Sequence, residues 1–250
     1  MKNKVLKMPN PVQPEINKRR QFLKLSGMVV VGSGLLMACS NDDDSSTPPD
    51  PNVFDLGAGN LGILNYAYAL EQLEAAFYQN VLDGSYWAGA PANEKQILED
   101  LYNHEVIHRE FFRTAITAVA PNDITPDLEF DFSSVDFSSR DSVLGTSKVL
   151  EDTGVGAYNG AGKLINANDA AGAAYLTLAG KIVSVEARHA SAIRNLLSPG
   201  TGSFAGDDIL VGIGTPPAFD KAVSPSDTLS AVASTNFVVT PFTANNLPTS

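Results

Sequence analysis

Cysteine is almost absent from this chain of 250 residues, and the one residue of this type is Cys39. A single cysteine excludes an intrachain disulfide, a zinc site of several thiolates and a cysteine-ligated iron–sulfur cluster. A metal ion bound by one copy of the chain must therefore be held by carboxylates and imidazoles, and the chain has three histidines.

Positive charge is also scarce, with 17 Lys and Arg against 28 Asp and Glu and a net charge of −11. Seven of the basic residues and one of the acidic residues lie in residues 1–38, so the rest of the chain has 10 basic and 27 acidic residues, or −17. This acidity makes nucleic acid and anionic lipid headgroups poor partners, and we expect neither.

The apolar stretch of residues 25–38 is too short to span a membrane, which takes about 20 residues. It follows Arg19 and Arg20 in the segment Lys-Arg-Arg-Gln-Phe-Leu-Lys, which resembles a twin-arginine export signature. The stretch therefore fits the apolar region of a signal peptide.

This stretch ends in Leu-Met-Ala-Cys, which resembles a lipobox, the motif whose cysteine becomes the lipidated first residue of a mature lipoprotein. We predict a signal peptide over residues 1–38 and lipidation of Cys39, against the alternative of an unmodified buried cysteine. Residues 39–58 begin with an acidic, proline-containing run and are expected to form a disordered tether. The mature protein is then anchored in the cell envelope, facing the periplasm or the cell surface, and touches the membrane through its lipid alone.

Four segments carry apolar residues at helical spacing or follow a helix-capping pattern. They cover residues 61–82, 94–119, 139–165 and 170–197. Asn93 with Gln96 resembles a capping box at the second segment, and Ser138 and Asn168 are the expected N-caps of the third and fourth.

Short turns at residues 83–92 and 166–169 join these helices into two antiparallel hairpins. Residues 120–138 can run back along the bundle, since about 19 extended residues reach roughly 60 Å and a helix of about 25 residues is roughly 38 Å long. We predict an all-α fold, a four-helix bundle over residues 59–198 with a long crossover between its second and third helices. Residues 199–250 are expected to form an irregular tail packed on the bundle, with one short helix near residues 226–233.

One constellation of residues occurs twice. Each copy has a Glu, a Tyr seven residues later, and a Glu-x-x-His pair whose side chains share one helical face. The first copy is Glu71, Tyr78, Glu105 and His108, and the second is Glu151, Tyr158, Glu186 and His189. This spacing is typical of a metal site.

Two neighbouring acids compete for one position of the repeat. Glu71 and Glu151 each follow a Leu and precede a Tyr by seven residues, whereas Glu74 aligns with Gly154. We therefore predict Glu71 as the ligand and Glu74 as an outer-shell residue or a surface acid. His104 aligns with Val185, and we expect it on the helix surface or in the outer shell of the site. Three arginines nearby could pair with ligand carboxylates, but we expect them on solvated faces: Arg109, Arg188 and Arg194.

The set of ligands resembles that of the ferritin-like di-iron carboxylate proteins, in which two helices each supply a Glu and two others each supply a Glu-x-x-His pair. Residues 70–78, Leu-Glu-Gln-Leu-Glu-Ala-Ala-Phe-Tyr, are similar to the ferritin-like branch that includes desiccation-related proteins. The resemblance covers about residues 60–197. It implies bridging ligands Glu105 and Glu186, single-ion ligands His108 and His189, terminal ligands Glu71 and Glu151, and tyrosines Tyr78 and Tyr158 that hydrogen-bond ligand carboxylates.

Electrostatics favours bound metal independently of the resemblance. Four carboxylates that face a helical core cannot all stay ionised alone, because each costs several kcal/mol to desolvate. Two divalent cations would neutralise them. Oxygen-rich ligands with two imidazoles suit iron or manganese, and zinc binding during purification is also compatible with them.

These predictions favour an oxidoreductase that uses two iron or manganese ions and takes oxygen or peroxide as its substrate, with a homodimer as a compatible assembly. One alternative is a non-enzymatic metal-binding or stress-protective module. Another is a zinc protease, since residues 104–108 read His-Glu-x-x-His: His104 and His108 would hold zinc, Glu105 would be the base and Glu129 the third ligand. That alternative leaves the second copy of the repeat unexplained.

Overall fold

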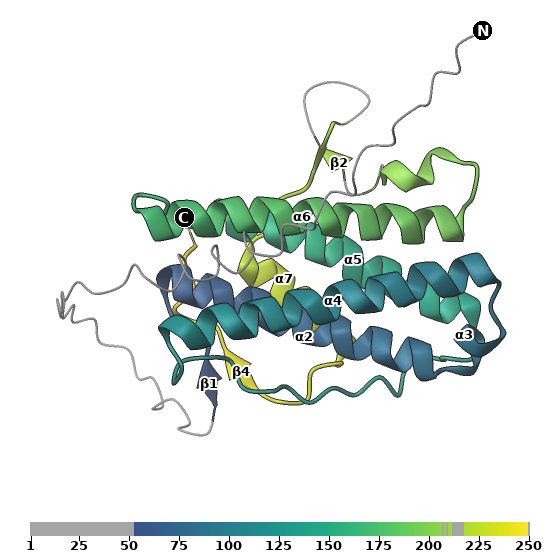
Figure 1. Cartoon of the computed structure of the whole chain (residues 1–250), viewed down its shortest axis with the longest axis horizontal. Coiled ribbons are helices and arrows are strands. Elements are labelled where there is room, and N and C mark those ends of the chain that lie inside the picture. Colours follow the sequence, from purple (N-terminus) through teal and green to yellow (C-terminus); the bar gives the residue numbers. More distant parts are fainter. Residues whose placement is uncertain (1–52, 207, 209, 212–217, 250) are drawn as a thin grey trace, which may run out of the picture. The chain divides into compact units, whose positions relative to one another are not determined.

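The computed structural model describes residues 53–206, 208, 210–211 and 218–249. Arg19, Arg20, Cys39 and most of the predicted tether lie outside these residues. Four long helices dominate the described part (Figure 1): α2 (Gly59–Asp83), α4 (Ala92–Val119), α5 (Arg140–Gly162) and α6 (Ala170–Leu197). Three shorter helical segments accompany them: α3 (Ser85–Gly89), the 3₁₀ helix η1 (Gly202–Ala205) and α7 (Pro225–Thr235).

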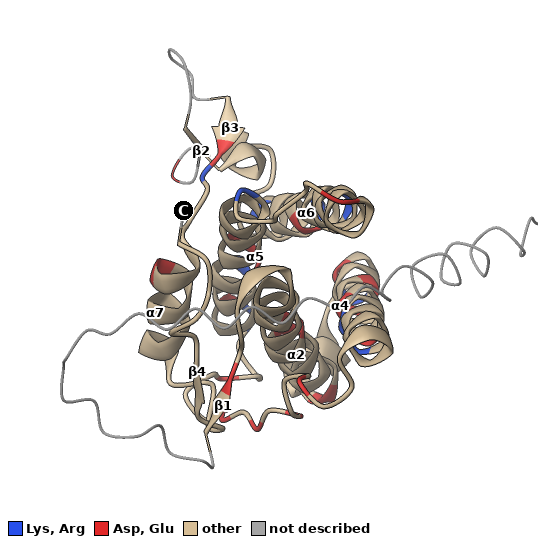
Figure 2. Ribbon diagram, turned by 90° about the vertical axis from the view of Figure 1, so that its left-hand side faces the viewer, with Lys and Arg blue, Asp and Glu red and all other residues tan. Residues whose placement is uncertain are grey.

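The four long helices form a bundle of two hairpins. α2 packs chiefly against α4, and α5 packs chiefly against α6, whereas α4 and α6 touch each other much less. Figure 2 looks along the bundle and shows these four helices at its corners. The predicted all-α bundle is confirmed. Within the described part of the chain, no helix combines the length and apolar character needed to cross a membrane.

The N-cap residues of three helices differ from the prediction. α4 begins ahead of Asn93 with Pro91 as its N-cap, and no side chain caps it, so the capping box predicted at Asn93 is wrong. Ser139 caps α5 and Asp169 caps α6, each one residue later than predicted, because their side-chain oxygens accept the N–H three residues on.

The crossover between α4 and α5 is fastened to α2 by two buried amides. Asn65 donates to the Asp123 carbonyl at 2.7 Å and accepts from the Thr125 N–H at 2.9 Å. Gln72 accepts from the Leu128 N–H at 2.9 Å. Since unpaired backbone groups are costly to bury, these side chains explain how an irregular segment can cover a helix.

The chain before α2 is ordered where a tether was predicted. Strand β1 (Phe54–Asp55) pairs in parallel with β4 (Phe242–Thr243), and Leu56 is completely buried in the core. A tether that extends to residue 58 is therefore wrong, because apolar residues at 54 and 56 bind this segment to the bundle.

The C-terminal segment packs closely on α5. Strand β2 (Leu210–Val211) pairs with β3 (Phe219–Asp220), and α7 then contacts α5. The Val223 N–H donates to the Gly156 carbonyl at 2.9 Å, and a Cβ at Gly160 would lie 1.6 Å from the Val223 oxygen. Glycine at position 160 is thus what allows the two backbones to touch.

The hydrophobic core is divided along the bundle axis. On α4, Leu98 and Leu101 belong to one buried apolar cluster, and Phe112 and Ile116 belong to a second. The same helix carries Glu105 between the two, at 0% exposure. The bundle thus has apolar layers on both sides of a polar middle.

Helix α2 is the central element of the bundle. Every residue from Gly62 to Ala75 is buried, including the side chains of two acids and two amides. The helix lies against α4 and α5, and the crossover and the C-terminal segment cover its remaining sides. An amphipathic pattern is therefore weak in α2, since it has no broad solvent-facing side.

Candidate metal centre

The structure brings six predicted ligands together in the polar middle of the bundle. They form two groups of four whose ligand atoms lie within 4.8 Å of one another, and both groups contain Glu105 and Glu186. The first group is Glu71, Glu105, His108 and Glu186; the second is Glu105, Glu151, Glu186 and His189. All six residues are buried, so the cluster is enclosed by the bundle.

The distances show a pseudo-twofold arrangement. Nδ1 of His108 lies 2.9 Å from Glu186 Oε1, and Nδ1 of His189 lies 2.7 Å from Glu105 Oε1. Each ring also has the Glu of its own helix at 3.5 Å, at the i, i+3 spacing. Both imidazoles thus present the same nitrogen to the centre, each nearest to the carboxylate of the other pair.

Eight ligand atoms of this cluster make no hydrogen bond of good geometry, although the nearest imidazole nitrogens and carboxylate oxygens lie only 2.7 and 2.9 Å apart. They are the Nδ1 atoms of both histidines, both carboxylate oxygens of Glu105 and Glu186, and Oε2 of Glu71 and Glu151. Buried polar atoms in native proteins are nearly always paired, and orphaned ones need an explanation such as an unseen ion. The convergence of these eight nitrogen and oxygen atoms therefore fits a pair of metal ions.

In the absence of metal, the pKa values of the clustered glutamates are strongly shifted. Burial raises the pKa of Glu71, Glu105 and Glu151. Burial also opposes ionisation of Glu186, but the two imidazoles beside it lower its pKa to about 2. The pKa of Glu105 and the pKa of Glu186 shift in opposite directions, because a proton on one carboxylate removes its repulsion of the other.

The histidines respond in the opposite sense to their burial. Burial lowers the pKa of His108, but Glu105, Glu186 and Glu71 around it outweigh that effect and raise the pKa to about 12. The pKa of His189 is raised for the same reason, against its burial, by Glu105, Glu151 and Glu186. Without a cation the cluster therefore collects protons, which is the behaviour expected of an anionic site.

Two tyrosines tie the halves of the repeat together. Tyr78 on α2 donates to Glu151 on α5, and Tyr158 on α5 donates to Glu71 on α2. Burial and the neighbouring carboxylates raise the pKa of both phenols well above the ordinary value, so they remain protonated donors. Each tyrosine thus orients the carboxylate of the other copy.

A sequence model described as a ferritin-like domain matches residues 59–199. This match covers more than half of the chain and all six clustered residues. The chain belongs to the ferritin-like domain family. A comparison with curated proteins finds no match.

In the ferritin-like domain, a fifth buried carboxylate lies beside the four clustered glutamates. Glu74 is 3% exposed, and its Oε2 has no hydrogen-bond partner. A Cβ added at Gly154 would lie 3.1 Å from Glu74 Oε1 and 3.8 Å from Glu186 Oε2. Burial, then repulsion from the four clustered carboxylates, raises the pKa of Glu74 well above the ordinary value. Of the two roles predicted for Glu74, the surface acid is wrong, and Gly154 supplies the space that the acid occupies.

His104 lies outside both groups but touches one of their members. Its Nδ1 is 2.8 Å from Nε2 of His189, although His104 is exposed and His189 is buried. His104 therefore combines the two positions considered for it, since it reaches both solvent and a clustered imidazole.

The zinc-protease alternative finds little in the ferritin-like domain to support it. Glu105 is 0% exposed and faces His189, whereas Glu129 is exposed. Among the described residues, no group of potential ligands contains His104 or Glu129. The His-Glu-x-x-His pattern thus coincides with one half of the repeat.

One arginine has a role that its sequence position did not indicate. Arg194 on α6 is 4% exposed and binds Asp152 on α5 through two nitrogens and Asp208 through the third. The expectation of a solvated face is wrong for Arg194, because its guanidinium is buried against Asp152 and Asp208. The pair also joins α6 to the residue next to Glu151.

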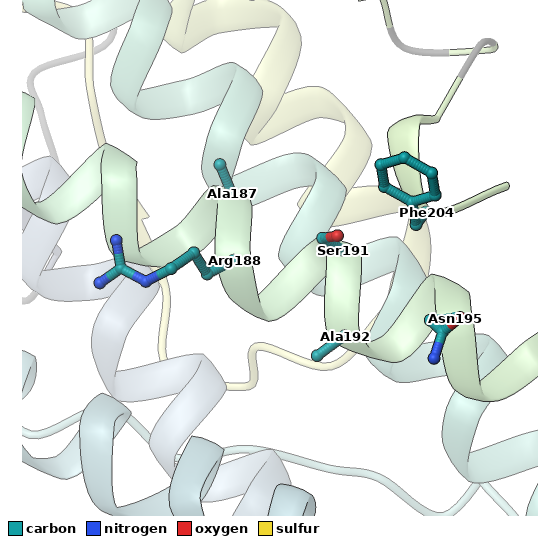
Figure 3. A pocket seen from close by; sticks show the side chains of 6 residues that line it. All are labelled: Ala187, Arg188, Ser191, Ala192, Asn195 and Phe204. Carbon is teal, nitrogen blue, oxygen red and sulfur yellow. The ribbon is translucent and has the colours of Figure 1, made fainter. Parts of the chain in front are cut away.

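An open depression of about 560 Å³ lies on another side of α6. Figure 3 shows its lining: Ala187, Arg188, Ser191, Ala192, Asn195 and Phe204. Five of these recur at intervals of one, three or four residues along α6, on a face rotated from the one that carries Glu186 and His189. This depression is therefore a surface feature separate from the buried cluster.

Proposed function

We propose that this ferritin-like protein binds two iron ions at the clustered residues and acts as an oxidoreductase with oxygen or peroxide as its substrate. The observation that carries the proposal is the convergence of eight buried ligand atoms, none with a well-formed hydrogen bond, in two overlapping groups. Manganese is the alternative metal, and zinc fits the same ligand types.

The geometry suggests a role for each side chain. Glu105 and Glu186 belong to both groups and would bridge the two ions. His108 with Glu71 would complete one subsite, and His189 with Glu151 would complete the other: these four residues are the ligands of single ions. Four carboxylates balance the charge of two divalent cations, which removes the cost of burying them alone.

A pair of reduced ions bound here supplies electrons and Lewis acidity for breaking an O–O bond. The protein contributes an enclosed environment in which the ligands are buried between two apolar clusters. Apolar residues on both sides of the cluster exclude water, which strengthens every electrostatic interaction inside it. Tyr78 and Tyr158 hold the outer carboxylates in place and keep their protons, so they can orient ligands without adding charge.

Small molecules would reach the cluster from the side between α4 and α6. These helices touch each other much less than either touches its hairpin partner. His104 is exposed on α4 and contacts the buried ring of His189 on α6, so solvent and cluster are one side chain apart there. Oxygen and peroxide are small enough to use such a narrow approach.

The direct test is iron uptake and oxidation by the purified chain. Anaerobic titration with Fe(II) should give two ions per chain, and oxygen or peroxide should then produce absorbance changes and oxidant consumption. Glu105→Gln should abolish the reaction. Glu110→Gln is the matched control, because Glu110 lies on the same helix but is exposed and pairs with Arg109. Equal oxidation by both variants would contradict the proposal.

Binding without reaction would support the non-enzymatic alternative. Two ions held tightly, with neither oxygen nor peroxide consumed, would indicate a metal-binding module without this oxidoreductase activity. The two proposals thus share the metal site and differ in one measurement.

We also propose export by the twin-arginine route and lipidation at Cys39, on the strength of the sequence motifs alone. Arg19→Lys with Arg20→Lys should retain the chain in the cytoplasm. Cys39→Ser should abolish incorporation of a labelled fatty acid and release the exported protein from the membrane fraction. Labelling of the Cys39→Ser variant at the wild-type level would exclude this anchor.

A further inference from the structure

The two halves of the cluster match at the six ligands but differ behind them. His104 precedes Glu105 on α4, and the equivalent residue before Glu186 on α6 is Val185. Only one subsite therefore has a histidine at this position. The inference below rests on the proposed metal site.

The contact between His104 and His189 fixes which nitrogen carries each proton when metal is bound. Nδ1 of His189 faces the carboxylates, 2.7 Å from Glu105, so it is the nitrogen available to a cation. A neutral imidazole that binds a cation through Nδ1 has its proton on Nε2. With a cation on Nδ1, Nε2 of His189 would donate to Nδ1 of His104, which lies 2.8 Å away.

His108 has no equivalent support within the described residues. Its Nδ1 also faces the carboxylates, 2.9 Å from Glu186. No protein group in the described part of the chain hydrogen-bonds its Nε2, whereas His189 has His104 at that place. The two rings are therefore alike on the side of the cluster and unlike on the opposite side.

We propose that His104 is a positioning residue that makes the two metal subsites unequal, with the tighter ion at His189. A hydrogen-bond acceptor behind a ligating imidazole holds its tautomer and ring orientation and raises its basicity. Removal of such a partner typically lowers metal affinity about 10- to 100-fold. The ion at His108, which lacks the partner, is then the weaker and more readily exchanged of the two.

Exposure of His104 makes the idea testable without damage to the core. Substitution of an exposed side chain usually changes stability little. His104→Val copies the residue found in the other half of the repeat, so it makes the two halves more alike. His104→Asn keeps an acceptor on a short side chain and serves as the rescue variant. Asn103→Val is the matched control, because Asn103 is exposed on the same helix.

In the test, the metal-free full chain is titrated with Co(II), and binding is measured by calorimetry and by the visible spectrum of the bound ion. Wild type should show two affinities, and His189→Gln should remove the tighter one. His104→Val should weaken the tighter step about 10- to 100-fold and leave the weaker step within about threefold. His104→Asn and Asn103→Val should both keep the wild-type pattern.

Two outcomes would overturn the inference and can be told apart. If wild type takes up no cobalt, the proposed metal site fails and the inference fails with it. If wild type binds two ions and His104→Val leaves both affinities unchanged, or weakens both equally, the metal site stands and the role of His104 is refuted.

Discussion

Tyr78 on α2 donates a hydrogen bond to Glu151 on α5, so a tyrosine of one copy of the repeat holds a carboxylate of the other. Tyr158 and Glu71 make the reciprocal contact. The two copies are therefore interlocked in pairs through the centre of the bundle. This relationship explains why Glu and Tyr recur together at a spacing of seven.

Tyr78→Phe should destabilise the protein by about 1.5–3 kcal/mol, because a hydrogen bond to a buried carboxylate is lost. Urea unfolding of the metal-free chain measures the change. Tyr102→Phe is the control, since the Tyr102 hydroxyl binds Gln79 in an exposed contact, and it should cost less than about 0.5 kcal/mol. Equal effects of the two variants would contradict the assigned role.

Gly154 and Glu74 should be energetically coupled. Gly154→Ala gains helix propensity of about 0.5–1 kcal/mol, but its Cβ would lie 3.1 Å from Glu74 Oε1. We expect the substitution to be stabilising only when Glu74→Ala has removed the carboxylate. A double-mutant cycle by urea unfolding should show a coupling above about 0.5 kcal/mol. Strict additivity would mean that Gly154 does not make room for the acid.

The close approach of Val223 to α5 predicts opposite effects at two glycines. Gly160→Ala should cost about 1–3 kcal/mol and expose the Val223 amide to hydrogen exchange, because the new Cβ would collide with a backbone oxygen. Gly145→Ala on the same helix has nothing within 4 Å and should stabilise by about 0.5–1 kcal/mol. Unchanged protection at Val223 in Gly160→Ala would show that the C-terminal segment packs elsewhere.

The pH dependence of stability should reverse when metal binds. Burial raises the pKa of Glu74 and Glu105 above 4.5 in the folded chain, and neighbouring carboxylates raise that of His108 from 6.5 to about 12. The folded chain thus keeps protons that the unfolded chain releases. The free energy of unfolding must therefore fall as the pH rises above about 4.5, by about 1.4 kcal/mol per pH unit for each proton retained.

Glu186 acts in the opposite direction but in another range. Its folded pKa of about 2 stabilises the protein above pH 4.5, and that contribution is lost as the pH falls from 4.5 toward 2. Metal ions bind the ionised carboxylates, so with Mn(II) the stability should rise between pH 5 and pH 8. Urea unfolding across this range, with chelator or with Mn(II), compares the two slopes. Identical slopes would argue against metal at these residues.

The repeat in the sequence was sufficient to find the six clustered residues. Helical spacing predicts that Glu105 and His108 share a face, and the second copy predicts that Glu186 and His189 meet them. These predictions depend on local periodicity and on the topology of two hairpins. The same signals located the four long helices, although several end residues of α2, α4 and α5 differ from the prediction.

The burial of Glu74 and Arg194 depended on contacts that local patterns do not contain. Glu74 is buried because Gly154, far away in the sequence, leaves a space against α2. Arg194 is buried because a distant segment brings Asp208 onto it. Similarly, the order of residues 53–58 depends on β4 near the end of the chain. Each of these features is decided by a partner more than ten residues away.

The most direct test of the account is anomalous diffraction from crystals of the full chain loaded anaerobically with iron. It should show two anomalous peaks between Glu105 and Glu186, one beside Nδ1 of His108 and one beside Nδ1 of His189. A lone peak held by His104 and His108, or no peak in the bundle, would contradict the two-metal centre.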